Sequence, residues 1–325
     1  VVLSLVPILP FTANTQFEFL TAGEIIAPYG FTNVAVEANI LSAQILTSGT
    51  EMTAVISLKS FADVVPPSNA QRVGLAINAV VSSGDTALNS IIGSLIPIRS
   101  DDEITSALNQ MDPVIYKGLV ISQQNNAVRV QEALGYRLQN ELDRIHCYGV
   151  QKASCVKDER LMHFWADGFG DALHQKSNTF ANSQQFGYQS NTGGDVAGID
   201  AHFAKYFYAG ALGAYTSTDT DWVEGQGTGG VNTGYAGLYF SAISDMFYGN
   251  LSVLGGWSGY TGNRVIQYTG VYETAHNTHN GSQLLSHADT GINLGWSGFT
   301  IRPFDSFDYI VQTEKGYVES GAGAY

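Results

Sequence analysis

The chain of 325 residues is long enough for one large domain or for two domains of ordinary size. Its 15 Lys and Arg stand against 29 Asp and Glu, and the net charge of −14 repels a phosphate backbone, which argues against a nucleic-acid partner. Two Cys are too few for a disulfide scaffold or a Cys-ligated zinc site. No apolar run approaches the roughly 18 residues of a membrane helix.

The composition divides the chain near residue 160. The second part holds 27 of the 36 Gly, 28 of the 37 aromatic residues and all four Trp, whereas the first part holds seven of the eight Pro. The second part is also acidic, with 14 acidic and five basic residues. A helical domain does not need so much Gly, and a disordered tail would lack the aromatic residues. We therefore expect two unlike regions.

Residues 1–65 predict short strands separated by turns. Residues 1–11 are apolar but carry no basic residue and no initiating Met, so we interpret them as the continuation of a longer chain rather than as a signal peptide. From Gln16 to Lys59, segments of β character alternate with Gly and Pro. This pattern is typical of short strands around tight turns.

Residues 66–160 predict helices. Asn69 is positioned to cap a first helix, and the run from Ser100 to Glu103 predicts a capping box for a second. Asp112 followed by Pro predicts the start of a long helix that ends near Ile145. Apolar residues recur at helical spacing on one side of this helix, and its other side is polar, with Gln123, Gln124, Arg129, Glu132, Arg137 and Glu141.

Residues 161–325 switch to a period of two, which predicts β-strands joined as sequential hairpins. Turns are expected at 191–194, 244–245, 260–263 and 280–281. The longest predicted strands exceed the 9–11 residues that cross a membrane, and they carry apolar side chains on one face and Gly, Asn, Ser, His and Asp on the other. Lipid outside and a wet lumen inside would produce this pattern, as in outer-membrane barrels. The alternative is a soluble β-sandwich with one buried face.

The polar strand faces supply candidate lumen-lining residues, which are Asp200, His202, Asn250, His287, Asp289 and Asn293. If the long helix occupies an acidic lumen, Arg129 and Arg137 pair with carboxylates of the wall; if it faces solvent, they are ordinary surface charges. The other reading of the strand His and Asp residues is a catalytic or metal site. No nucleophile elbow, phosphate loop or HExxH pattern supports it, so we expect no catalytic residue, no metal and no cofactor.

Two further groups carry ligand-type side chains. His276 and His279 are three residues apart, but the surrounding Asn and Gly indicate a surface loop rather than a metal site. Asp219, Asp221 and Glu224 are interpreted as a solvated acidic loop, with divalent-ion binding as the alternative.

Several passages, taken in order, resemble the carboxy-terminal region of bacterial autotransporter (type V secretion) proteins. "FEFLTAGEI" at 17–25 and "TAVISLKSFADV" at 53–64 resemble the last rungs of a passenger β-helix. "NAQRVGLAINAV" at 69–80 and "ALNQMDPVIYKGLVISQQNNAVRV" at 107–130 resemble the helical junction. "HFWADGFGD" at 163–171 is similar to a first barrel strand, and "AGALGAYTSTDTDW" at 209–222 and "VNTGYAGLYFSA" at 231–242 to barrel hairpins.

The resemblance implies a mainly β fold with a helical segment. The end of a passenger β-helix is expected at 1–65, a helical junction and linker at 66–160 and a transmembrane β-barrel at 161–325. The family's barrel has twelve strands, whereas turn spacing predicts about nine here, so we expect an incomplete barrel. The implied function is a non-enzymatic translocator that exports an upstream passenger and displays it at the cell surface. The alternatives are a passive or adhesin-like outer-membrane barrel without cargo, and a hydrolase activity located upstream.

The resemblance also implies partners and two local features. The expected partners are outer-membrane lipid, the barrel assembly machinery and periplasmic chaperones. Cys147 and Cys155 enclose a short loop that an exported protein carries through an oxidising compartment, so we predict a disulfide there. Some relatives cleave between adjacent Asn residues in a helix held within the barrel, and Asn125-Asn126 is a partial match lying about 36 residues before the first strand. We take an uncleaved anchor as the default.

Overall fold

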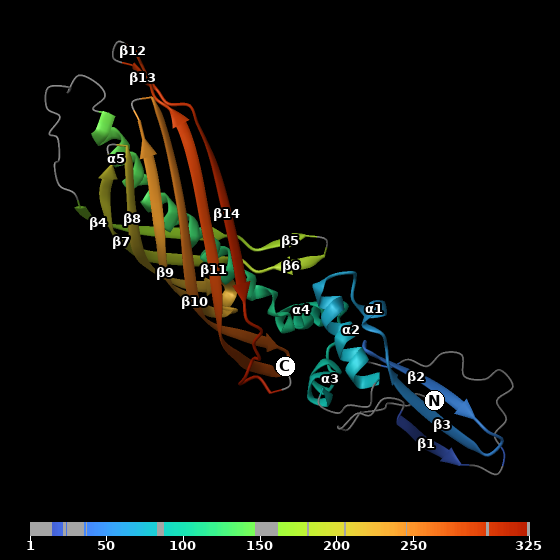
Figure 1. The fold of residues 1–325 in the computed structure, drawn as a ribbon. Coiled ribbons are helices and arrows are strands. Elements are labelled where there is room, and N and C mark those ends of the chain that lie inside the picture. Colours follow the sequence, from blue (N-terminus) through green and yellow to red (C-terminus); the bar gives the residue numbers. More distant parts are fainter. Residues whose placement is uncertain are drawn as a thin grey trace.

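A computed structural model describes residues 15–21, 24, 36, 38–82, 88–146, 162–180, 182–204, 206–244, 246–296 and 299–323. Three parts follow one another along the chain: a small sheet, a group of helices, and a large curved sheet with one long helix against it (Figure 1). Strands give way to helices between Leu58 and Phe61, and helices give way to strands between His146 and Met162.

The small sheet contains β1 (Thr15–Thr21), β2 (Leu41–Thr47) and β3 (Glu51–Leu58), in the order β1-β3-β2. The expected β-rich segment is present, but both strand pairs are antiparallel, whereas the rungs of a β-helix stack in parallel. The physical reason lies in the connection between β2 and β3. It is a tight turn in which the Ser48 amide donates to the Glu51 carbonyl at 2.9 Å, and so short a link permits only an antiparallel return.

The helical part contains α1 (Phe61–Val64), α2 (Asn69–Ser82), α3 (Asn89–Leu95), α4 (Asp101–Met111) and the 3₁₀ helix η1 (Pro113–Tyr116). Ile92, Leu95 and Leu108 are fully buried in its core. Ser100 precedes α4 without a side-chain capping bond, so the predicted capping box does not form. Asp112 does cap η1, because its carboxylate accepts from the Val114 amide at 3.0 Å.

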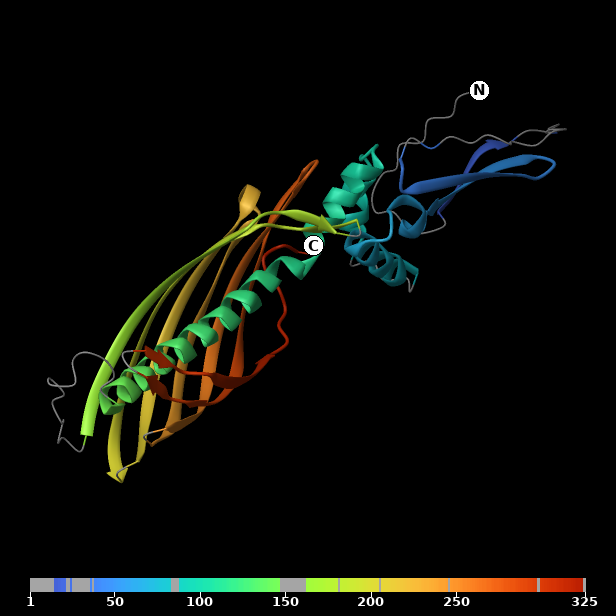
Figure 2. The same cartoon turned by 90° about the horizontal axis from the view of Figure 1, so that it is seen from above.

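The predicted long helix is confirmed as α5 (Lys117–His146), a continuous helix of 30 residues. At 1.5 Å per residue it is about 45 Å long. It lies along the concave side of the large sheet (Figure 2). Across the described part of the chain, no helix is both long and apolar enough to cross a membrane.

The large sheet is antiparallel and has seven strands in the order β14-β11-β10-β9-β8-β7-β4. Its strands are β4 (Met162–Gln175), β7 (Tyr188–Ala204), β8 (Phe207–Trp222), β9 (Gly227–Ile243), β10 (Phe247–Tyr268), β11 (Val271–Ile292) and β14 (Phe304–Glu314). Two short hairpins extend it, β5 (Asn178–Phe180) with β6 (Ser183–Gln185) and β12 (Leu294–Trp296) with β13 (Phe299–Ile301). Within the described strands, β4 and β14 are the two open edges, so the sheet is a partial barrel.

Seven long strands replace the nine or so that were predicted, because three expected turns lie inside strands. Residues 191–194 belong to β7, 260–263 to β10 and 280–281 to β11. In each of these segments a glycine packs against an aromatic ring instead of reversing the chain. A Cβ added at Gly194 would overlap the ring of Phe169, and one at Gly262 would overlap the ring of Tyr116. Glycine in a strand interior often marks such a close approach.

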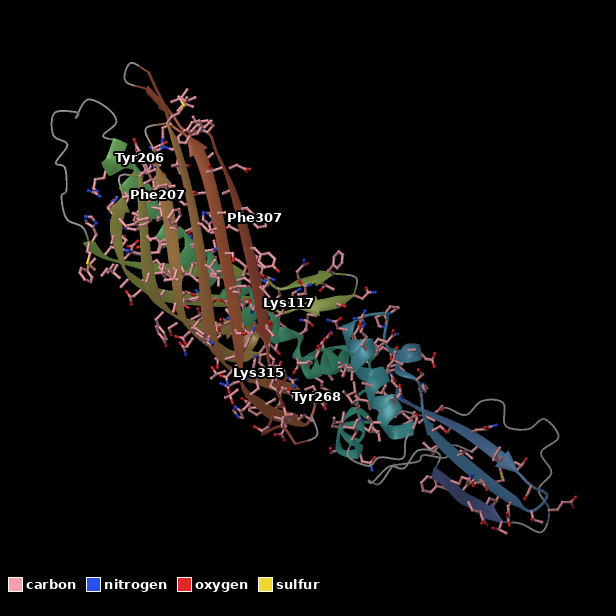
Figure 3. The ribbon with its side chains drawn as sticks, viewed as in Figure 1. Lys117, Tyr206, Phe207, Tyr268, Phe307 and Lys315 are labelled. Carbon is pink, nitrogen blue, oxygen red and sulfur yellow. The ribbon has the colours of Figure 1, made fainter. Side chains whose placement is uncertain are left out.

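The two faces of the large sheet differ in chemistry. On the concave face, Tyr208, Tyr235, Tyr239 and Leu254 form a core with the α5 residues Val130, Leu134 and Leu138. The convex face exposes apolar and aromatic side chains from all seven strands, including Phe164, Phe203, Phe207, Leu238, Leu251, Trp257, Leu284, Phe307 and Tyr309 (Figure 3). A surface of this extent is too apolar for contact with water alone.

Candidate functional site: the helix within the half-barrel

We call the concave face of the large sheet the wall. The first turns of α5 contact it through neutral polar groups. The Ser122 and Ser190 hydroxyls are 2.9 Å apart, and the Gln123 amide donates to Ser258. The Asn126 amide donates to Thr218 Oγ1 at 2.7 Å and accepts from the Thr192 hydroxyl at 3.2 Å. Asn126 is fully buried. The wall positions are inward-facing Ser and Thr residues of β7, β8 and β10, so alternation along the strands supplies these partners.

One turn further along, Arg129 makes the first charged contact with the wall. Its Nη2 lies 2.7 Å from Asp171 Oδ1 on β4, and its Nη1 lies 2.9 Å from Glu132 on the same helix. The other Asp171 oxygen accepts from the Asn125 amide at 2.6 Å. The Arg129 side chain is 37% exposed, so water screens this ion pair.

Arg137 forms the most buried charged contact between α5 and the wall. Its Nε and Nη2 donate to the two carboxylate oxygens of Asp200 at 3.0 and 2.9 Å, which is the bidentate geometry that guanidinium groups favour. Its Nη1 lies 2.7 Å from Glu141 Oε1. The Tyr239 hydroxyl donates to Asp200 at 2.8 Å and accepts from the Trp165 ring nitrogen at 2.8 Å.

The last turns of α5 extend this charged network. Glu141 Oε2 accepts from Arg144 at 2.7 and 2.9 Å, and the His202 ring nitrogen lies 3.2 Å from Arg144 Nη2. Near the end of the helix, Asp143 pairs with Arg302 at 2.8 Å. The Arg302 Nε donates to Asn293 Oδ1 at 2.7 Å. Residues near both edges of the sheet, His202 on β7 and Arg302 before β14, therefore contact the end of α5 and fix its rotation about the helix axis.

Three of the predicted lumen-lining residues bond within the wall. The Asn250 amide donates to Asp289 at 2.6 Å and its oxygen accepts from Ser241 at 2.6 Å. His287 bridges Asp289 and Asp308, with distances of 3.4 and 2.7 Å. All these groups lie on the concave side, since they share the register of the inward-facing residues of β10 and β11.

Sequence reasoning did not find several partners that hold the helix. Asp171, Glu141, Tyr239 and Trp165 carry contacts as close as those of the predicted residues. A signal for two of them was present, because Trp165 and Asp171 share the alternation of β4 and therefore its inward face. Alternation also places the Ser and Thr partners of α5 on the inward face, but it does not show which of them α5 contacts.

Two predicted loops are strands or strand ends. His276 and His279 lie inside β11, not in a surface loop, because their segment pairs with β10 throughout its length. Asp219 and Asp221 are exposed on β8, and Glu224 lies in the short 3₁₀ turn η3 (Val223–Gly225). Among the residues with described positions, no three His, Cys, Asp or Glu side chains form a metal-binding group. Cys147 and Cys155 lie outside the described residues, so their disulfide stays a prediction.

Comparison with known protein families gives a match for the part of the chain that forms this wall. Residues 164–325 match the protein family described as Autotransporter beta-domain. No curated protein and no solved structure matches the chain. The family consists of translocators of the outer membrane rather than of enzymes, and a large antiparallel sheet with a helix on its concave side agrees with its β-barrel. The chain therefore belongs, through residues 164–325, to the autotransporter β-domain family and carries an outer-membrane translocator domain of type V secretion.

Proposed function

We propose that this translocator exports the part of the protein that precedes α5 and displays it at the cell surface. In this proposal α5 stays in the pore as an anchor, and the chain before it leaves at one end of the barrel. The observation that carries the proposal is the set of buried contacts between α5 and the inward face of the wall, above all Arg137 with Asp200.

The positions of the two helix ends support this direction. The end of α5 contacts Arg302, beside the β12–β13 hairpin, through Asp143. Its start adjoins η1 and α4, which pack against the far tip of β10 and β11. At the same tip the hydroxyl of Ser94 on α3 lies 2.6 Å from that of Tyr268 (Figure 3). A helix of about 45 Å exceeds the roughly 30 Å of a bilayer's hydrocarbon core. The helical part and the small sheet thus lie on one side of the membrane.

The convex face supplies the lipid contact that we propose. Its exposed aromatic and aliphatic side chains form the apolar band of an outer-membrane protein. Pairing between neighbours satisfies the backbone groups of the five inner strands, as hydrocarbon requires, and in the membrane the outer edges of β4 and β14 need further partners. By the family resemblance, we further propose insertion by the barrel assembly machinery with the help of periplasmic chaperones.

The helical part gives a physical basis for one-way export without a cofactor. Residues of α1 to α4 form a buried core that includes Leu41 of β2 and Ile56 of β3 and also packs on Ile266 and Ala275 of β10 and β11. Folding of such a core outside the membrane buries apolar surface, and a folded unit does not return through the pore. Export of this kind needs no nucleotide hydrolysis.

Surface protection of a tag tests the proposal. The full-length protein receives an epitope tag directly before Val1 and is made in a Gram-negative host. We expect the tag to be removed by protease added to intact cells while a periplasmic marker survives. A tag that is cut only after the outer membrane is opened would overturn the proposal and favour a barrel without exported cargo. Heat-modifiable gel migration shows in the same samples that the barrel is folded.

A further inference from the structure

Residues 315–323, which follow β14, form a strap beside the start of α5. The strap begins where the Lys315 amide donates to the Asn280 carbonyl at 2.9 Å, and Lys315 lies toward the helical end of the sheet, as does Lys117 (Figure 3). Further on, His276 and Ser320 exchange two backbone hydrogen bonds of 2.7 and 2.9 Å. Between its contacts the strap is open to solvent, and Val318 is 89% exposed.

Glu319 connects the strap to the chain that enters the pore. Its carboxylate binds the guanidinium of Arg264 on β10 at 2.5 and 3.2 Å and accepts from the Tyr116 hydroxyl of η1 at 2.8 Å. Arg264, which is 2% exposed, also donates to the Gln110 carbonyl at the end of α4. Burial, together with this carboxylate, raises the pKa of Tyr116 far above its usual value, so the hydroxyl stays a donor.

Tyr317 and Ala322 are the other two anchors of the strap. The Tyr317 ring stacks on His279 with centroids 4.4 Å apart and meets the edge of Tyr116 at 6.0 Å. Ala322 is 4% exposed and lies in the core of the helical part. The side chains of Tyr317 and Glu319 therefore contact η1, and that of Ala322 contacts the helices, in addition to their contacts with the wall.

Glycines separate the anchors. Gly316 precedes Tyr317 and has open space where a Cβ would be, and Gly321 lies between Glu319 and Ala322 with φ of 95°, in the region that favours glycine. A segment held at separate points, with glycines and exposed residues among them, has fewer contacts to lose on opening than a strand inside the sheet.

We propose that the strap is a gate at the mouth of the pore, which is the end of the half-barrel beside the β10–β11 hairpin. The gate is open while the chain passes and closes when η1 reaches the mouth. This inference rests on the proposed export function. Tyr116 and the helix residues of the core around Ala322 arrive at the mouth only at the end of export, whereas Ile266 and Ala275 of that core belong to β10 and β11. Before their arrival, the contacts left to the strap are those with β10 and β11, namely Glu319 with Arg264, Tyr317 with His279 and the backbone of Ser320 with that of His276. Closure then fixes η1, α4 and the β10–β11 hairpin together.

A disulfide that locks the strap tests the gate. His276→Cys with Ser320→Cys replaces a hydrogen-bonded antiparallel pair, whose Cα atoms lie about 5.5 Å apart and suit a disulfide. The protein carries the tag before Val1, and Cys147 and Cys155 are replaced by Ser. We expect the oxidised lock to lower surface display of the tag about tenfold and a membrane-permeant reductant to restore it. The control pair, Thr261→Cys with Thr278→Cys, joins two strands that are already paired.

The outcomes separate the gate from the export function. Equal display by the oxidised lock and the wild type, with heat-modifiable migration in both, would overturn the gate. Loss of display in the control pair, the reduced lock and the wild type would instead overturn the export function, and with it the gate.

A second variant tests the closed state after export. Glu319→Gln weakens the contact with Arg264, so we expect trypsin to cut after Lys315 about tenfold faster in the displayed protein. Glu224→Gln removes an exposed carboxylate from the β8–β9 connection and should leave the rate unchanged. Equal rates for the Glu319→Gln variant and the wild type would contradict the assigned anchor.

Discussion

The two halves of α5 are held against the same wall by different chemistry. The half that begins at Lys117 uses buried Ser, Gln and Asn side chains against Ser and Thr, and its one ion pair with the wall, Arg129 with Asp171, is partly exposed. The half that ends at His146 uses Arg137 and Glu141 against Asp200 and its neighbours. Neutral hydrogen bonds contribute little net free energy but require partners, whereas a buried charge is costly unless its counter-ion is present.

This difference assigns a task to each half. The charged half tolerates only one rotation of the helix, since any other would move Arg137 away from Asp200 and leave that carboxylate buried without its arginine. The part of the wall that faces the neutral half lets an exported chain pass more readily, because its Ser and Thr hydroxyls form no strong binding site for a moving chain. We therefore infer that the charged half sets where α5 stops.

The largest expected effect comes from Arg137→Met. It leaves the buried Asp200 carboxylate without its arginine, while Glu141 keeps Arg144, and breaking such a buried pair lowers the free energy of unfolding by about 3–5 kcal/mol. Urea unfolding of the detergent-solubilised domain, followed by heat-modifiable gel migration, measures this change. Adding Asp200→Asn to the variant should restore more than half of the loss. A single variant as stable as the wild type would remove the distinction between the two halves.

Asn126→Ala probes the neutral half and should have an intermediate effect. The substitution removes two hydrogen bonds, but Thr192 and Thr218 retain their mutual contact of 2.8 Å. We expect a loss of about 1–2 kcal/mol in the same urea experiment. Asn140→Ala, at an exposed position of the same helix, is the matched control and should change stability little. A loss as large as that of Arg137→Met would show that neutral contacts hold the helix as firmly as charges.

Arg129→Met should have a smaller effect than either, although Arg129 also pairs with a wall carboxylate. Its side chain is 37% exposed, so solvent compensates for the lost ion pair, and the expected loss is below about 1 kcal/mol. Raising the salt concentration should reduce the difference from wild type further, because exposed charges are screened. A loss that is large and insensitive to salt would place Arg129 with the charged half.

The sequence predicts the elements better than their contacts. The 3.6-residue period and Asp112-Pro113 predict α5 closely, because helix signals are local. Turns were overcounted in the sheet, since glycines such as Gly194 and Gly262 serve close packing under rings that come from distant residues. Local sequence carries no record of those rings. The antiparallel pairing of β1 to β3 was missed for the same reason, as strand direction depends on how the chain returns.

The candidate site divides in the same way. Alternation places Asp200 on the polar face of its strand, and helical spacing places Arg137 on the polar face of α5. Which arginine meets which carboxylate depends on the depth and rotation of the helix in the half-barrel. Those are set by packing of residues such as Leu134 and Leu138 against Tyr239, so the pairs become visible only in three dimensions.

The smallest expected effect concerns the bond between Asn125 and Asn126, which we predict to stay intact in the displayed protein. Cleavage requires the Asn125 amide nitrogen to attack its own backbone carbonyl, but that nitrogen donates to Asp171 at 2.6 Å. The peptide lies inside the continuous helix α5, and both amide atoms of Asn126 are bonded to the wall. Mass spectrometry of the outer-membrane domain should therefore give the same mass for the wild type and, apart from the substituted residue, for Asn125→Asp. A new amino terminus at Asn126 that disappears in Asn125→Asp would show that the neutral half of α5 is a cleavage site instead of an anchor.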